Sequence, residues 1–313
     1  MATMDLRPMT LGEVLDRTFT VYKENFWLFT GIIGIPYLVV VAFSWVYGQF
    51  LTSATGVPTP GVAMTPAAMG QLLGETLVSG GLLMIVFLLV LAAAQAATVA
   101  AVSDLYLGRP AAIGQSYREV RGRFLTVLLA MVLTMLISAF AAAAPMLLGG
   151  ALVALLARSP LAILGVLFLV FGTFAVAIGM YCRMALAVPA ATLEPVGAGG
   201  AISRSFQLTK GNALEVFAVL VLMIFLEIVA VVIFQAPFLF AMGSLTKPHA
   251  LPLWMGILQS LASWVSGVLV APIGTIAFSL IYYNQRVRKE AFDLEKLMAA
   301  LEPGQTPPSP SAA

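Results

Sequence analysis

The chain has 313 residues, of which 61% are hydrophobic and only 10% are charged, with a net charge of +2 and a mean hydropathy of +1.01. A soluble domain normally carries about 25% charged residues, so this composition excludes an ordinary soluble protein and predicts an all-α polytopic membrane protein. The small net charge, with no basic cluster interleaved with aromatic residues, excludes nucleic acid as a partner. The single cysteine, Cys182, excludes an intramolecular disulfide and a multi-thiolate metal site.

Six apolar runs are long enough to cross a membrane, which takes roughly 20 residues for about 30 Å of hydrocarbon. The first, at about 26–50, follows a segment rich in acidic residues, so we expect a retained helix rather than a cleaved signal peptide. The others lie at about 76–102, 124–147, 161–187, 214–240 and 254–283. Pro145 with Gly149-Gly150 is expected to kink or end the third helix. The segment 51–70 reads as an external loop, Arg158-Ser159-Pro160 as a turn, and 303–313 as a disordered tail.

Basic residues are strongly biased to one side of the predicted spans. Of the 16 Lys and Arg residues, 14 fall in the two terminal segments and in the loops after the second and fourth spans, while only Arg158 and Lys247 fall in the opposite loops. The positive-inside rule therefore predicts that both termini are cytoplasmic. An alanine-rich composition is typical of a high-GC bacterium, so the expected location is the plasma (inner) membrane.

One sequence pattern occurs three times, each time just before a predicted span. It consists of an aliphatic residue, a hydroxyl residue, an aromatic residue and, four positions later, a basic residue: Leu15-Thr18-Phe19-Lys23, Ile113-Ser116-Tyr117-Arg121 and Ile202-Ser205-Phe206-Lys210. The steps of three and four place the apolar members on one face of a helix, and Thr10 with Glu13 is a plausible capping box for the first helix. We therefore predict three parallel repeats of an interfacial helix plus a transmembrane hairpin, at about 8–105, 108–190 and 196–300, in a single domain of residues 1–302.

The opposite faces of these three helices carry basic side chains. If the helices lie in the interface plane, their aromatic edges should face the headgroup region and their basic edges should face anionic lipid phosphates. The alternative is that these segments are only short connections that turn the chain into the spans, with no binding role. The expected partners are membrane lipids, with a membrane protein as a further candidate. The predicted lipid-contacting residues are Arg17, Lys23, Arg118, Arg121, Arg204 and Lys210.

Glu227 lies near the middle of the fifth predicted span. A charge there costs about 2.5–3.5 kcal/mol on insertion scales, so Glu227 should face protein or water, or be protonated. Gln95 and Gln235 are the candidate hydrogen-bond partners. Two interpretations stay open: a proton or ligand site, or a neutral glutamate that bonds one neighbouring helix.

Polar residues also end the even-numbered spans on the predicted cytoplasmic side. They either meet at the repeat axis or serve only as interfacial anchors, and the sequence favours anchoring. The residues are Asp104, Tyr106, Arg183, Tyr282, Asn284 and Arg286. The sequence has no Gly-rich phosphate loop, Ser/His/Asp grouping, zinc-ligand spacing or nucleotide fingerprint, so we expect no catalytic residue, no metal and no cofactor.

Several segments resemble the glycerophosphoryl diester phosphodiesterase membrane-domain family. They are Leu6–Arg17, Arg204–Gly211, Tyr282–Glu295, and Arg183 followed by Pro189-Ala190 and Leu193-Glu194. The chain departs from the family pattern at Asn284-Gln285, where an acidic-aliphatic pair is usual, and at Ala291, where glycine is usual. The resemblance covers nearly the whole chain and implies a membrane domain.

The resemblance does not imply catalysis by this chain. In phosphodiesterases with such a domain, the chemistry belongs to a separate soluble barrel with paired histidines and clustered carboxylates. This chain has one histidine, His249, which we expect to be a loop residue, and only 30 residues follow the last predicted span. We expect a non-enzymatic scaffold, assembly or regulatory module that grips anionic lipid. The alternative is a permease or lipid-handling protein with a cavity between its three hairpins near Glu227.

Overall fold

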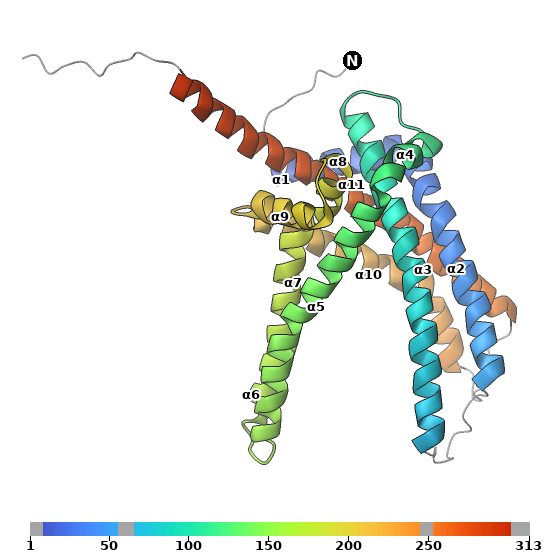
Figure 1. Ribbon diagram of the computed structural model, residues 1–313. Helices are drawn as coiled ribbons and strands as arrows, with labels where there is room; N and C mark the ends of the chain where they lie inside the picture. The colour runs from blue at the N-terminus through green and yellow to red at the C-terminus, as the bar shows by residue number, and fades with distance from the viewer. Residues whose placement is uncertain (1–8, 56–65, 245–252, 302–313) are drawn as a thin grey trace, which may run out of the picture.

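The computed structural model describes residues 9–55, 66–244 and 253–301, and within these ranges it contains helices and turns but no strand (Figure 1). Six of the described helical segments are long and apolar enough to cross a membrane. The predicted class and number of spans are therefore confirmed, and the protein is an integral, multi-pass membrane protein. His249, Lys247, the middle of the predicted loop 51–70 and the tail 303–313 lie outside the described residues.

Five of the six spans begin within one residue of the predicted apolar runs, but the second begins at Pro66, ten residues before the predicted start. The predicted loop 51–70 is therefore wrong at its two ends, which are helical up to Thr55 and from Pro66. Pro145, Gly149 and Gly150 do not end the third span, since it continues to Leu155, and the turn follows at 156–161 around the predicted Arg158-Ser159-Pro160. Five spans are the continuous helices α2 (Phe26–Thr55), α3 (Pro66–Tyr106), α5 (Phe124–Leu155), α10 (Ala213–Ser244) and α11 (Leu253–Leu301). The fourth span is assembled from α6 (Ala162–Leu167), the π-helical turn η2 (Phe168–Gly172) and α7 (Thr173–Met184).

Short helices form where the repeated pattern predicted them. They are α1 (Leu11–Glu24), α4 (Ile113–Val120, continued by the 3-10 turn η1, Arg121–Arg123) and α9 (Ala198–Thr209). The capping box of α1 is present, because the Thr10 amide donates to Glu13 Oε2 at 2.7 Å and the Glu13 amide donates to Thr10 Oγ1 at 3.4 Å. A further short helix, α8 (Ala187–Leu193), follows α7 and was not predicted.

The hydroxyl position of the pattern is the most deeply buried one. Thr18, Ser116 and Ser205 are each 0% exposed. The short helices therefore pack their hydroxyl faces against protein, and the predicted aromatic edge among lipid headgroups is wrong for Tyr117, whose hydroxyl donates to the Ile32 carbonyl at 2.6 Å. The reason is that the spanning helices beneath offer apolar surface and carbonyl acceptors, which satisfy a tyrosine as well as an interface does.

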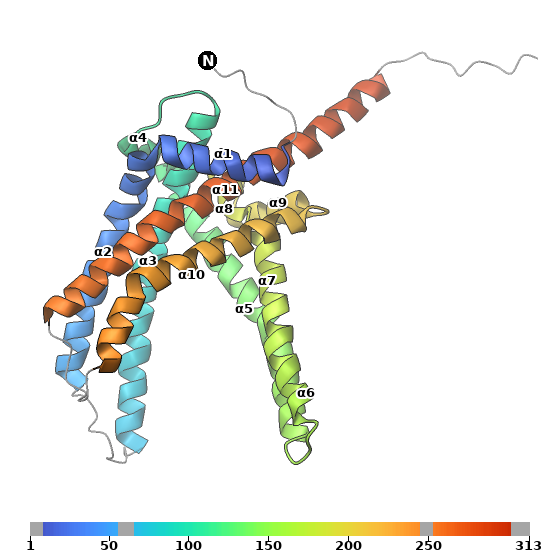
Figure 2. The ribbon, with the colours of Figure 1, turned by 180° about the vertical axis from the view of Figure 1, so that it is seen from behind.

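The short helices gather at one end of the molecule, which we call the polar end: α1, α4, α8, α9 and the carboxyl-terminal part of α11. Figure 1 shows the α5–α7 hairpin and the α2–α3 pair extending from this end and diverging. Figure 2 shows α10 and α11 crossing obliquely between them. Helix α11 is the centre of the bundle, because it contacts α1, α2, α3, α8, α9 and α10. In its most apolar 18-residue stretch, 61% is buried inside the protein, compared with 6% in the corresponding stretch of the fourth span.

Candidate functional site

A network of charged side chains ties three helices together at the polar end. Glu194, the residue after α8, accepts hydrogen bonds from Tyr282 Oη at 2.6 Å and from Arg204 Nε at 2.9 and 3.1 Å. Arg204 also pairs with Glu290, which accepts a bond from Arg286 Nε at 2.7 Å. These five residues, which we call the Glu194 network, comprise two carboxylates, two guanidinium groups and one tyrosine hydroxyl, and they link α8 and α9 to α11.

The network keeps Glu194 ionised. Burial alone would raise the pKa of this carboxyl, but the hydrogen bonds from Tyr282 and Arg204 and the positive charges of Arg204 and Arg286 lower it further than burial raises it. The pKa of Glu194 therefore lies below its ordinary value. At neutral pH the carboxylate is charged and its charge is compensated, so the network can lie against an apolar core.

Two further sets of hydrogen bonds hold α8 in place. Arg123 Nη1 donates to the carbonyls of Thr192 and Glu194 at 3.0 and 2.6 Å, which satisfies acceptors that the end of a helix leaves open. Ser205 Oγ donates to the Arg183 carbonyl at 2.8 Å and accepts from the Leu186 amide at 3.1 Å, at the break between α7 and α8. Helix α8 is therefore fixed from both ends.

Asn284 and Gln285, where the chain departs from the family pattern, form buried hydrogen bonds between helices. Both side chains are almost fully buried, at 2% and 0% exposed. The Asn284 amide accepts from the Met9 backbone N–H at 2.8 Å and donates to the Met9 carbonyl at 3.0 Å. Gln285 donates to Glu215 Oε2 at 2.9 Å and accepts from Asn212 Nδ2 at 2.5 Å. The pair therefore fastens the start of α1 and the start of α10 to α11.

A cavity of about 680 Å³ lies below α8, between the hairpins. Its walls come from α3, α5, α7, α10 and α11, so all three hairpins contribute, and Val188 and Pro189 of α8 close it towards the polar end. The volume falls in the range of about 300–1,000 Å³ that is usual for small-molecule sites. The cavity is partly open to the outside of the bundle.

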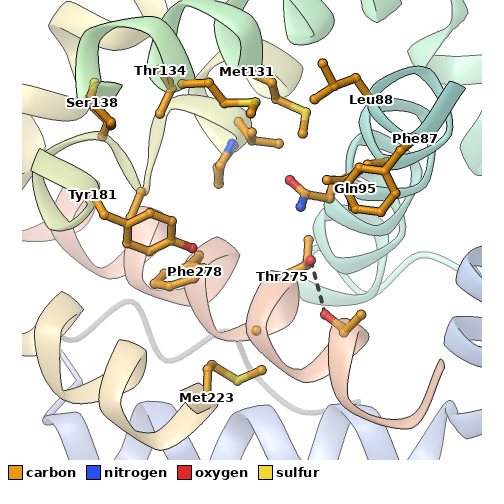
Figure 3. Close-up of a pocket in the computed structure, with 18 residues that line it drawn as sticks. Phe87, Leu88, Gln95, Met131, Thr134, Ser138, Tyr181, Met223, Thr275 and Phe278 are labelled. Carbon is orange, nitrogen blue, oxygen red and sulfur yellow. Dashed lines mark hydrogen bonds between the residues drawn. The ribbon is translucent and has the colours of Figure 1, made fainter. Parts of the chain in front are cut away.

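The cavity wall is mostly apolar. Figure 3 shows Phe87, Met131, Met223 and Phe278 around it. No Asp, Glu, Lys, Arg or His is among the lining residues, all of which lie in the described part of the chain. The polar lining groups include Gln95, Thr134, Ser138 and Thr275. Across the described ranges, no group of three or more His, Cys, Asp or Glu residues is placed to hold a metal ion.

The three intramembrane polar residues do not meet. Gln95 lines the cavity, whereas Gln235 donates to Ser263 Oγ on α11. Glu227 is exposed on α10 outside the cavity lining, and it has no hydrogen bond to any described residue. The predicted pairings of Glu227 with Gln95 or Gln235 are therefore not formed.

The predicted helix-end residues meet only in part. Tyr282 and Arg286 belong to the Glu194 network, and Asn284 bonds to Met9. The others lie at separate places: Tyr106 stacks on Tyr283 with ring centroids 4.7 Å apart, Asp104 lies 3.9 Å from Arg109, and Arg183 lies near Lys210 and Lys289. One oxygen of Asp104, Oδ2, is buried without a partner.

Five of the six predicted lipid-contacting residues are exposed, namely Arg17, Lys23, Arg118, Arg121 and Lys210. Arg204 is different, since its guanidinium is engaged by Glu194 and Glu290 inside the protein. The sequence prediction missed both glutamates as site residues. The spacing of Arg286 and Glu290, four apart on one helix, was the available signal for one of them.

Residues 157–306 match the family model for the membrane domain of glycerophosphoryl diester phosphodiesterase. The predicted resemblance is confirmed over these residues, whereas its predicted extension to nearly the whole chain, including Leu6–Arg17, lies outside the match. The stretch that matches this membrane domain contains the whole Glu194 network, but α3 and α5, which form the other side of the cavity, lie outside it. No curated protein and no solved structure matches the chain.

Proposed function

We propose that the protein is a non-enzymatic, lipid-handling membrane module that holds the hydrocarbon part of a lipid in the cavity between its three hairpins. The observation that carries this proposal is the cavity itself, with about 680 Å³ of mostly apolar space in the membrane-spanning region. Helices that only pack against each other are enriched in small residues at their contacts, whereas Phe, Leu and Met side chains form much of the lining of this space. The cavity therefore favours the lipid-handling alternative.

The lining residues support a binding role over catalysis. Ser138 and Thr134 carry hydroxyl groups, but the lining includes no histidine, lysine or carboxylate that would activate them. Because most basic residues lie at the polar end, we assign this end to the cytoplasmic side of a plasma membrane. Val188 and Pro189 of α8 line the cavity, so α8 then lies between the cavity and the cytoplasmic side.

The test is photo-cross-linking in lipid nanodiscs with a diazirine-bearing acyl chain, followed by peptide mapping. Ala271 lines the cavity and is exposed to it, so Ala271→Phe fills the space without clashing with a closed core. Ala144 of α5 is exposed outside the lining, so Ala144→Phe is the matched control. We expect strong labelling of cavity peptides in the wild type and in Ala144→Phe, and reduced labelling in Ala271→Phe. Equal labelling in all three proteins would contradict the proposal.

A second candidate function, attachment to anionic lipid at the cytoplasmic surface, is favoured by the exposed basic residues of α1, α4 and η1 and by Lys210. Each such residue contributes about 1 kcal/mol near an anionic surface. Arg121→Glu with Lys210→Glu should lower the amount of phosphatidylglycerol that co-purifies, measured by lipid mass spectrometry. Arg158→Glu, at the opposite end of the molecule, is the control. Unchanged phosphatidylglycerol in the double variant would eliminate this role.

A further inference from the structure

Gln95 lines the mostly apolar cavity and has no hydrogen-bond partner among the described residues. It lies near the middle of the 27-residue span Gly80–Tyr106, about 16 Å along the helix axis from Tyr106 at about 1.5 Å per residue. Figure 3 shows its side chain directed from α3 into the cavity. The amide makes no hydrogen bond to any residue in the described ranges. Because the hydrocarbon of a bilayer offers no donor or acceptor, an amide at this depth is costly unless something in the cavity bonds to it.

Two hydroxyl groups on α5, across the cavity from Gln95, also lack hydrogen-bond partners among the described residues. Ser and Thr residues in spanning helices commonly donate to the carbonyl four residues earlier, as Ser44, Thr98 and Ser279 do at 2.7, 2.8 and 2.7 Å. Thr134 and Ser138 of α5 make no such bond, nor any other within the described part of the chain, and both line the cavity (Figure 3). The cavity therefore presents an amide from α3 and two hydroxyls from α5.

The lining sets a limit on the charge of the ligand. A phosphate or carboxylate buried among these residues would find no cation, since no charged side chain is part of the described lining. An isolated charge in such a site is strongly disfavoured. A pure hydrocarbon is also a poor match, because it would leave the amide and both hydroxyls unbonded.

We propose that the cavity recognises a neutral amphiphile, such as a diacylglycerol or a long-chain alcohol, whose ester or hydroxyl group bonds to Gln95 while its alkyl chain packs on the apolar wall. This inference rests on the proposed lipid-handling function and names the class of lipid. It assigns Gln95 as the specificity-determining residue and Thr134 and Ser138 as supporting groups. Phosphate-bearing lipids bind instead to the exposed basic residues of the polar end, outside the cavity.

The test is competition against the diazirine-bearing acyl probe in nanodiscs with three competitors of matched chain length: a diacylglycerol, the corresponding phosphatidic acid and a hydrocarbon. One hydrogen bond to a neutral group corresponds to about a three- to tenfold preference. We expect diacylglycerol to compete three- to tenfold better than the hydrocarbon and better than phosphatidic acid. Gln95→Leu should abolish the preference over the hydrocarbon while retaining probe labelling. Gln235→Leu, which removes an intramembrane amide bonded to Ser263 outside the cavity, should retain the preference.

The outcomes separate the two proposals. If no lipid competes with the probe in the wild type, the lipid-handling function fails. If lipids compete but phosphatidic acid or hydrocarbon matches diacylglycerol, or if Gln95→Leu keeps the preference, lipid handling stands and recognition through Gln95 is refuted. Retained probe labelling in Gln95→Leu shows that the variant is folded, so loss of the preference alone is the supporting result.

Discussion

Replacing Gly149 by alanine tests the packing of the α5–α7 hairpin. A Cβ at this position would lie 2.5 Å from Leu169 Cα and 2.8 Å from Leu169 N, both backbone atoms. Carbon atoms in contact are normally about 3.5–4.0 Å apart, so the two helices must separate by roughly 1 Å. No rotamer change relieves a clash with backbone, and overpacking of this kind costs about 1–3 kcal/mol. We expect Gly149→Ala to destabilise the protein by that amount.

The neighbouring glycine provides the control. A Cβ on Gly150 would meet nothing within 4 Å, and alanine is favoured over glycine in a helix by up to about 1 kcal/mol. Gly150→Ala should therefore be neutral or stabilising. Thermal unfolding in detergent, followed by intrinsic fluorescence, measures both variants under the same conditions. Equal effects of the two substitutions would refute the close approach of α5 to η2 and with it the need for glycine there.

Three further predictions concern the polar end and Glu227. Tyr282→Phe removes a hydrogen bond to the ionised Glu194 and should lower the free energy of unfolding by about 1.5–3 kcal/mol. Tyr283→Phe removes a hydrogen bond to the neutral Ser103 and should lower it by about 0.5–1.5 kcal/mol. Similar losses of stability in the two variants would argue against a charge-assisted bond at Tyr282. Because folding lowers the pKa of Glu194, its contribution to stability is complete above the ordinary pKa of 4.5 and is lost as the pH falls through the lower folded value. Unfolding temperatures should therefore drop in acid more steeply in the wild type than in Glu194→Gln, and parallel pH profiles would contradict this. Glu227→Gln should leave probe labelling unchanged and alter stability by no more than about 0.5 kcal/mol; loss of labelling would restore Glu227 to the functional site.

The sequence predicted the features that a bilayer imposes directly. Spanning helices must satisfy their own backbone groups and present apolar side chains, so hydropathy located all six. The threefold pattern located α1, α4 and α9, because each pattern has the period of an amphipathic helix. It did not show that the hydroxyl face packs on protein. That depends on which helices lie beneath, and the sequence alone does not define them.

The features that the sequence missed depend on contacts between distant residues. Asn284 bonds to Met9 across 275 positions of the chain, and Tyr282 bonds to Glu194 across 88. The sequence singled out Glu227 because an intramembrane acid is rare. The cavity instead contains Gln95, which was predicted only as a partner for Glu227. The orientation of a helix, rather than the residue type, decides which polar group faces the cavity.

The most direct test of lipid handling is an experimental map of the protein in lipid nanodiscs, determined by electron cryomicroscopy with a bound antibody fragment. We predict elongated density in the cavity between α3 and α5, with its polar part within hydrogen-bonding distance of the Gln95 amide. A map in which the cavity is closed, with Gln95 bonded to a neighbouring helix, would contradict it.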